Sequence, residues 1–158
     1  MRTPENIHAD ALPAFGQALL DGVLFAIYWL NGIEYALVAL PATAEISGPW
    51  GEVGRSAKTT HGDGEANTRS MAEVGSGIAI QALELGAFIP SALEAHLLMH
   101  AKEVGLVDDL REDRFYWTST QSSAYYAYSM DFDDGWQNLT VKNLERPVRL
   151  VRKIPIIR

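Results

Sequence analysis

Phe115-Tyr-Trp-Thr-Ser-Thr120 is a run of aromatic, β-branched and hydroxyl residues that contains neither glycine nor proline. This composition favours a β-strand. Three further runs of this kind follow, at residues 124–132, 136–141 and 148–154. Asp133-Asp134-Gly135 supplies turn residues between two of them. The last third of the chain is therefore predicted to form an antiparallel sheet.

An earlier pair of strands is predicted at residues 23–30 and 33–40. Between these two apolar runs stands Asn31-Gly32, and both residues accept the positive φ of a type I′ hairpin turn. Both runs are apolar on both faces, so we expect them in the middle of a sheet that is covered on each side. Trp29 and Trp117 are expected in the core.

Two helices are predicted between the hairpin and the C-terminal sheet. The first begins near Asn67 or Thr68 and ends at Gly86. The second begins with the capping box Ser91-Ala-Leu-Glu94 and ends at Gly105. Its expected core stripe is Leu93, Leu97, Ala101 and Val104. Hairpin, helices and sheet in this order predict an α+β fold.

The domain organisation follows from the remaining segments. Residues 1–20 lack a clean period and are expected to form an N-terminal arm for docking or oligomerisation. Residues 21–158 are expected to form one domain, since a chain of 158 residues with 47% hydrophobic and 21% charged residues is ordinary for a single globular unit. Residues 41–67 are rich in glycine and are expected to be an irregular loop.

Composition excludes several classes of chemistry. The chain has no cysteine, which excludes disulfides, thiolate metal sites and cysteine nucleophiles and fits folding in a reducing cytoplasm. A net charge of −7 argues against nucleic acid as a partner. The most apolar run, residues 23–30, is too short to cross a bilayer, so no membrane insertion is expected.

The charges are unevenly placed. Residues 142–158 contain six of the 13 Lys and Arg residues, and acidic residues gather just before them. Neutralisation between neighbouring elements is the favoured interpretation, with Arg149 and Arg152 paired to the preceding acids; a basic docking tail is the alternative.

No metal or cofactor is predicted. His96 and His100 are spaced to share a metal on a helix, but no third ligand is evident. Asp131, Asp133 and Asp134 could offer oxygen ligands to calcium, yet they lack the spacing of a calcium loop and suit a solvated hairpin tip. No catalytic motif is present, so no enzymatic residue is predicted.

The aromatic residues of the C-terminal sheet point to binding. Alternation places Tyr126 and Tyr128 on the face of Met130 and Phe132, which we expect to be core. Tyr125 would lie on the other face, among polar residues of the kind that paratopes use and that ordinary sheet surfaces also show. The candidate binding residues are Tyr125, Asp131, Asp133, Asp134, Trp136, Gln137 and Asn138.

Several motifs together resemble a domain family of unassigned function in the C-type-lectin-like and formylglycine-generating-enzyme-like superfamily. The resemblance covers about residues 21–154 and is carried by the stretches at 116–120, 125–128, 131–135 and 146–152, by Phe88-Ile-Pro-Ser-Ala-Leu-Glu94, and by Gly62-Asp-Gly-Glu-Ala-Asn-Thr68. Two departures stand out: Phe88 and Ile89 replace the usual Arg-Leu, and the cysteines of many relatives are missing.

The resemblance implies a C-type-lectin-like fold and a location in a virion. Members of this family are common in phage tail fibres and bacterial surface proteins, so we expect a non-catalytic receptor-binding domain of a tail fibre or tail tip, assembled in the host cytoplasm. Its partners would be a host surface protein or glycan, other tail proteins, and copies of itself in a homotrimer. A structural tail connector without receptor contact is the alternative.

Overall fold

The computed structural model describes residues 6–158, so the first five residues of the predicted arm lie outside it. The described α-helices are α1 (Gly64–Glu73), α2 (Gly77–Glu84) and α3 (Ala92–Glu103). The described strands are β1 (Ile7–His8), β2 (Ala18–Leu19), β3 (Gly22–Leu30), β4 (Ile33–Ala39), β5 (Ile46–Pro49), β6 (Phe115–Gln121), β7 (Tyr126–Asp131), β8 (Gln137–Val141), β9 (Glu145–Val148) and β10 (Val151–Ile157). This mixture confirms the α+β class.

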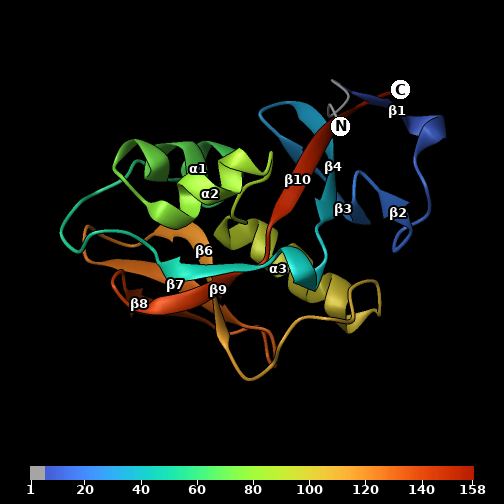
Figure 1. The fold of residues 1–158 in the computed structure, drawn as a ribbon. Coiled ribbons are helices and arrows are strands. Elements are labelled where there is room, and N and C mark those ends of the chain that lie inside the picture. Colours follow the sequence, from blue (N-terminus) through green and yellow to red (C-terminus); the bar gives the residue numbers. More distant parts are fainter. Residues whose placement is uncertain (1–5) are drawn as a thin grey trace.

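The predicted hairpin forms the centre of a five-stranded sheet with the order β1-β10-β4-β3-β2. β3 and β4 pair antiparallel up to Leu30 and Ile33. Asn31 and Gly32 have φ values of 52° and 78°, as a type I′ turn requires. Figure 1 shows this sheet on the right, with α1 and α2 at the upper left and the β6-β7-β8 sheet at the lower left.

Both faces of the five-stranded sheet are covered, as the apolar pattern predicted. On one face Phe25 and Leu37 pack in a core with α3 residues such as Leu98. On the other face Leu24, Ala36 and Ile154 pack against residues from the first 20 of the chain. Residues 6–20 therefore lie against the domain, and β1 pairs in parallel with the end of β10. Trp29 is not core, because 66% of its side chain is exposed beside the hairpin tip, beyond the part of β3 that β2 borders.

The first predicted helix is in fact two helices. Gly75 adopts a φ of +90° after α1, and Ser76 then caps α2 by accepting a hydrogen bond from the Ala79 amide. Glycine tolerates this left-handed conformation, which ends one helix and lets the chain turn into the next. The two helices cover a second core that includes Trp50, Trp117 and Val148, so the prediction of Trp117 as core is confirmed.

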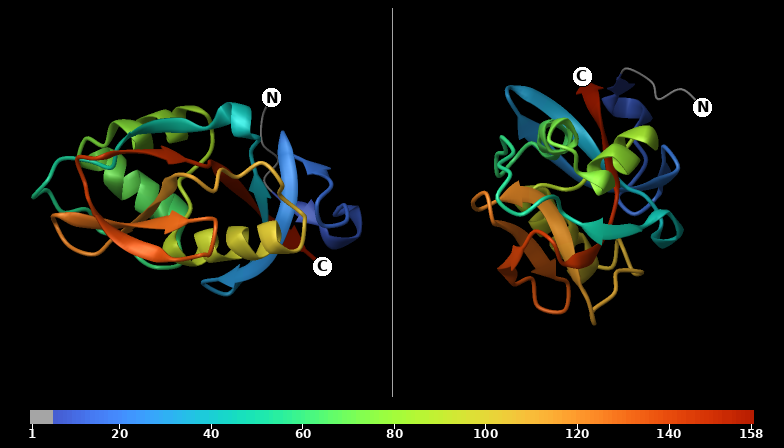
Figure 2. Two further views of the ribbon diagram at one scale, coloured as in Figure 1. Left: turned by 90° about the horizontal axis from the view of Figure 1, so that it is seen from below. Right: turned by 60° about the vertical axis from the view of Figure 1, so that its left-hand side comes forward.

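α3 begins as predicted, but its buried face matches the predicted stripe only in part: Ala101 is buried and Leu97 packs against the core. Ser91 and Glu94 form the complete capping box. The buried side consists of Ala92, Ala95, Leu98, Met99 and Ala101. Within the predicted stripe, Leu93 is 44% exposed and Val104 is 55% exposed. Figure 2 (left) shows α3 extending from the C-terminal sheet towards the β3–β4 hairpin.

The C-terminal strands do not form one sheet. β6, β7 and β8 pair antiparallel as predicted, and we call them the C-terminal sheet. The fourth predicted strand divides into β9, which pairs with β5, and β10, which pairs with β4. β5 lies in the segment predicted as an irregular loop.

Candidate functional site

The C-terminal sheet is buried on both faces at the α3 end, and one of its faces is open at the other end. One face carries Tyr126, Tyr128 and Met130 in alternation. Met130 is fully buried, Tyr128 is half-buried and Tyr126 is 46% exposed, so exposure rises along the strand. Gln137, next to Met130, donates to the Ala92 carbonyl at the start of α3 (2.8 Å). The helix therefore covers only one end of this face.

Tyr126 and Tyr128 are consequently not the core residues that alternation predicted. The period of two is correct, because the two tyrosines do share a face with buried Met130. Their exposure depends on which residues pack over this face, not on the alternation of the strand. The centre of the Tyr128 ring lies 5.7 Å from that of the His61 ring, whereas Tyr126 lies beyond this contact.

The opposite face of β7 is packed along its middle. Ser129 is fully buried and its hydroxyl lies 2.7 Å from that of Thr140. Ala127 belongs to the same core as Trp50 and Trp117. The expected polar recognition face through Ser129 is therefore not available to a partner, and only its ends reach the surface.

The aspartates of the β7–β8 connection hold the turn. Asp131 accepts a hydrogen bond from the Asp133 amide, and Asp134 accepts one from the Trp136 amide, both at 2.9 Å. Carboxylates that accept from backbone amides two residues ahead stabilise turns. Asp133 and Asp134 are exposed, and Gly135 completes the turn with a φ of +82°.

Trp136 offers the largest exposed side chain near this turn. It is 57% exposed, and its ring packs edge-on against Phe115 at 6.1 Å. The guanidinium of Arg146 lies 5.9 Å from the Phe115 ring. The neighbours Gln137 and Asn138 are half-buried: Gln137 joins β8 to α3, and the Asn138 side chain accepts from the Leu139 amide.

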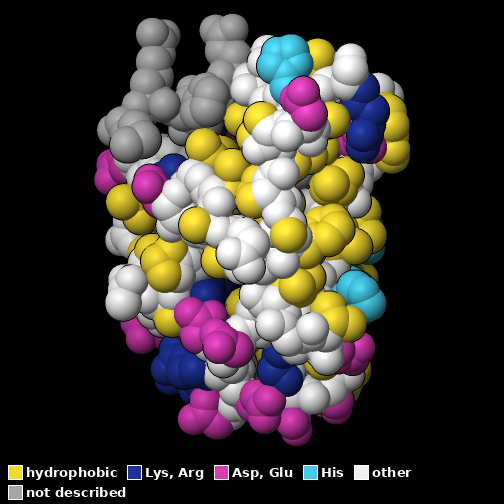
Figure 3. Space-filling model, turned by 90° about the vertical axis from the view of Figure 1, so that its right-hand side faces the viewer, with side chains coloured by type: hydrophobic (Ala, Val, Ile, Leu, Met, Phe, Trp, Pro, Cys, Tyr) yellow, Lys and Arg dark blue, Asp and Glu magenta, His cyan; other side chains and the backbone are white. Residues whose placement is uncertain are grey.

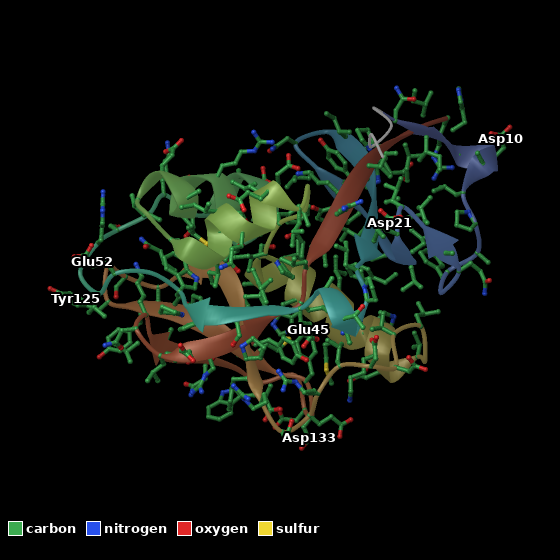
Figure 4. The ribbon with its side chains drawn as sticks, viewed as in Figure 1. Asp10, Asp21, Glu45, Glu52, Tyr125 and Asp133 are labelled. Atoms are coloured by element: carbon green, nitrogen blue, oxygen red, sulfur yellow. The ribbon has the colours of Figure 1, made fainter. Side chains whose placement is uncertain are left out.

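Tyr125 lies at the other end of β7. Figure 4 places it beside Glu52, while Asp133 lies on a separate edge of the molecule. The Gly54 amide donates to the Ala124 carbonyl (2.9 Å), which fixes the loop of residues 51–56 next to Tyr125. The seven candidate residues therefore occupy two places: Tyr125 lies at the loop end, and the other six lie at the turn end.

Two exposed residues at these places were missed from the sequence. Tyr126 was assigned to the core, and Leu139 was not considered, yet Leu139 is 47% exposed and pairs directly with Tyr128. The pairing register of β7 and β8 would have revealed Leu139, because residues opposite each other in a ladder share a face. We call Tyr125, Tyr126 and Trp136 the exposed aromatic rim.

The interior holds a carboxylate that joins three segments of the chain. Glu94 is fully buried; it accepts hydrogen bonds from the amides of Ser91 (2.8 Å) and Gly64 (3.1 Å) and from the Tyr28 hydroxyl. Burial raises the pKa of Glu94 above its usual range, and burial beside Glu94 also raises the pKa of Tyr28. Lys153 and Asp63 form an ion pair nearby (3.3 Å). These contacts tie the starts of α1 and α3 to β3.

A buried lysine anchors the loop beside Tyr125. Lys142 is fully buried, and its ammonium donates to the Arg55 carbonyl (3.0 Å) and to Gln121 Oε1 (2.8 Å). The ammonium also lies 4.5 Å from the centre of the Trp50 ring. Both acceptors are neutral oxygens, and burial lowers the pKa of Lys142 to about 8.

Arg149 forms the third interior junction. It is 3% exposed, donates to the Leu40 carbonyl (2.6 Å), and pairs with Glu45 (3.1 Å) and with Asp109. The pairing with Asp109 confirms the predicted neutralisation by the acids upstream. Arg152 pairs instead with Asp21 (3.4 Å), because β10 returns to the N-terminal sheet.

Within residues 6–158, no group of three or more His, Cys, Asp or Glu side chains is placed to hold a metal ion. His96 and His100 are both exposed on α3. None of the described helices has the length and hydrophobicity needed to span a bilayer. No protein-family model matches this chain, and no curated protein sequence is significantly similar to it.

Proposed function

We propose that this protein is a non-catalytic binding domain that contacts a macromolecular partner through the exposed aromatic rim. The observation that carries the proposal is the exposure of Tyr125, Tyr126 and Trp136, each between 46% and 57%, at the edges of a sheet whose middle is buried. Aromatic side chains on a rigid support provide contact area at a small cost in conformational entropy, and they dominate many protein interfaces.

The interior supports a binding module over an enzyme. Glu94, Lys142 and Arg149, three ionisable residues with at most 3% exposure, each bond to backbone or side chains of other segments. Catalytic acids and bases need to reach a substrate. These three groups are instead used to hold α1, α3, the 51–56 loop and the N-terminal sheet together.

The biological setting of the proposal rests on the sequence resemblance. A C-type-lectin-like domain of a phage tail fibre or tail tip would bind a host surface protein or glycan, as part of a homo-oligomer in the virion. A tail connector remains the second candidate, and it would use surfaces other than the rim for its contacts.

Adsorption of virions, or of purified protein, to host cells tests the rim. Alanine variants at Tyr125, Tyr126 and Trp136 are expected to adsorb at least about tenfold less, since truncating an aromatic anchor typically costs about 2 kcal/mol or more of affinity. Leu85→Ala is the matched control, because Leu85 is 49% exposed just after α2 and lies outside the rim. Normal adsorption by all three rim variants at unchanged melting temperature would favour the connector.

A further inference from the structure

Residues 51–56, Gly-Glu-Val-Gly-Arg-Ser, form a segment on the surface between two buried residues, Trp50 and Ala57. None of the six residues is buried, and Val53, their single hydrophobic side chain, is 38% exposed. Figure 3 shows hydrophobic side chains gathered on the opposite side of the molecule from this segment, whose Glu52 is labelled in Figure 4. Segments that bury little apolar surface open locally at a small cost in free energy. We call residues 51–56 the flap.

Two hydrogen bonds fix the middle of the flap beside Tyr125. The Gly54 amide donates to the Ala124 carbonyl (2.9 Å), and the Lys142 ammonium donates to the Arg55 carbonyl (3.0 Å). The Lys142 amide also donates to the Tyr125 carbonyl (3.1 Å), so one residue holds both the flap and the tyrosine. A Cβ atom at Gly54 would lie 3.8 Å from the Tyr125 ring, which shows that the flap borders this ring.

The Lys142 ammonium is buried among neutral groups. Its two acceptors are the Arg55 carbonyl and Gln121 Oε1 (2.8 Å), and Gln121 Oε1 also accepts from the Ala57 amide (2.9 Å). Glu52 lies 3.9 Å from the Arg55 guanidinium, at the surface of the flap. In the described part of the chain Lys142 forms no ion pair with the titratable and charged groups of the segments around it, which are Glu52, Arg55, Lys58, Tyr125, Tyr126 and Glu145.

A buried charge without a counter-charge favours any state in which water reaches it. Lifting the flap would provide such a state, because it removes the Arg55 carbonyl from the ammonium while Trp50 and Ala57 stay packed in the core. The pKa of Lys142 agrees with this cost, since burial lowers it to about 8 from 10.5.

We propose that the flap exchanges between a closed form that borders Tyr125 and an open form in which water hydrates the Lys142 ammonium. The protonated side chain favours the open form and the neutral amine favours the closed form, so raising the pH closes the flap. With a pKa of about 8 when closed and 10.5 when open, the ratio of open to closed molecules falls about tenfold between pH 7 and 9. The consequence for binding rests on the proposed function: a partner that contacts Tyr125 and the flap together selects the closed form.

Trypsin detects the open form, because it cleaves after arginine and the Arg55 carbonyl is bonded to Lys142 in the closed form. The rate of cleavage between Arg55 and Ser56 is divided by the rate for a synthetic peptide of residues 50–60 in the same buffer. This ratio is expected to fall about tenfold from pH 7 to 9 in the wild type and to stay constant in Lys142→Met. Lys58→Met is the matched control, because Lys58 is exposed and its variant should keep the wild-type response.

Cleavage after Arg69 separates opening of the flap from unfolding of the domain, because Arg69 lies within α1 and becomes a substrate only when that helix unfolds. Cleavage after Arg55 should be at least about tenfold faster than cleavage after Arg69. Equal rates at the two sites would overturn the proposal. A wild-type ratio that does not change with pH, or the same change with pH in Lys142→Met, would also overturn it.

Gly54→Pro should hold the flap open. Gly54 has a φ of +91° and donates to the Ala124 carbonyl, and proline permits neither. Cleavage after Arg55 should therefore be faster than in the wild type even at pH 9, and adsorption to host cells should fall as in Tyr125→Ala. Normal adsorption by Gly54→Pro beside impaired Tyr125→Ala would remove the flap from the binding surface. Normal adsorption by both would count against the proposed function at Tyr125 and would leave the cleavage results standing.

Discussion

The interior cluster of Tyr28 and Glu94 and the exposed aromatic rim both contain tyrosines, but these tyrosines do opposite things. In the interior, Tyr28 and Glu94 satisfy each other and two backbone amides, so every polar atom is fixed by the fold. At the rim, Tyr125, Tyr126 and Trp136 are 46–57% exposed to solvent. The difference teaches that burial, rather than residue type, separates groups that shape this protein from groups available to a partner.

Removing the interior carboxylate should have the largest effect. Glu94→Ala leaves the Gly64 and Ser91 amides and the Tyr28 hydroxyl without their acceptor and destroys the capping box. Each unsatisfied buried group costs about 1–3 kcal/mol, so we expect a loss of about 4 kcal/mol in the free energy of unfolding or a failure to fold. Chemical denaturation measures this loss.

Glu94→Gln is the control that keeps the shape. Its amide oxygen can still accept from Gly64 and Ser91, so the loss should be about 1 kcal/mol or less. Burial raises the pKa of Glu94, so the wild type binds this proton more tightly when folded. It should therefore lose stability as pH rises above the usual carboxyl range, and Glu94→Gln should not. Equal losses of stability in Glu94→Ala and Glu94→Gln would show that the hydrogen bonds accepted by Glu94 do not stabilise the fold.

The capping box around Glu94 also shows which features could be predicted from the sequence. It depends on residues three apart, as the Asn31-Gly32 turn depends on adjacent ones, and both are present in the structure. Such local signals are complete within a few residues. The order of elements and the α+β class follow from them.

Exposure and sheet membership could not be predicted, because they depend on what lies opposite. α3 is apolar on two sides, so periodicity could not tell the packed side from the Leu93 and Val104 stripe. Tyr126 shares its face with buried Met130 but extends past the end of the α3 cover. β5 contains Gly48 and Pro49 and is a strand only because it pairs with β9. No local sequence pattern predicts that pairing.

The buried Lys142 should make the stability of the protein depend on pH. Because burial lowers the pKa of Lys142 to about 8 from 10.5, the folded protein loses this proton earlier than the unfolded chain does. Below about pH 8 the buried charge of Lys142 destabilises the folded protein in full. This destabilisation disappears as the pH rises to 10.5. Between pH 7 and 9 the wild type should gain about 1 kcal/mol relative to Lys142→Met.

Denaturation of both proteins across this pH range measures the difference between their unfolding free energies. The comparison with Lys142→Met removes the contribution of other groups, such as Tyr28 and Tyr116, whose raised pKa values act at higher pH in both proteins. A constant difference from pH 7 to 10 would show that the ammonium remains hydrated in the folded state.

The smallest effect on stability is expected at the rim. Tyr125→Ala, Tyr126→Ala and Trp136→Ala remove side chains that are 46–57% exposed. Surface substitutions of this kind usually change stability by about 0.5 kcal/mol or less. Trp136 should lie at the upper end, because its ring also contacts Phe115 at 6.1 Å. Tyr125 should lie at the lower end, because its hydrogen bonds are made by its backbone: its amide donates to the Ser123 hydroxyl, and its carbonyl accepts from the Lys142 amide. Thermal melts of the three variants beside Glu94→Ala decide the point: a rim variant that melts as early as the Glu94 variant would place that aromatic among the groups that hold the fold, and would remove it from the binding surface.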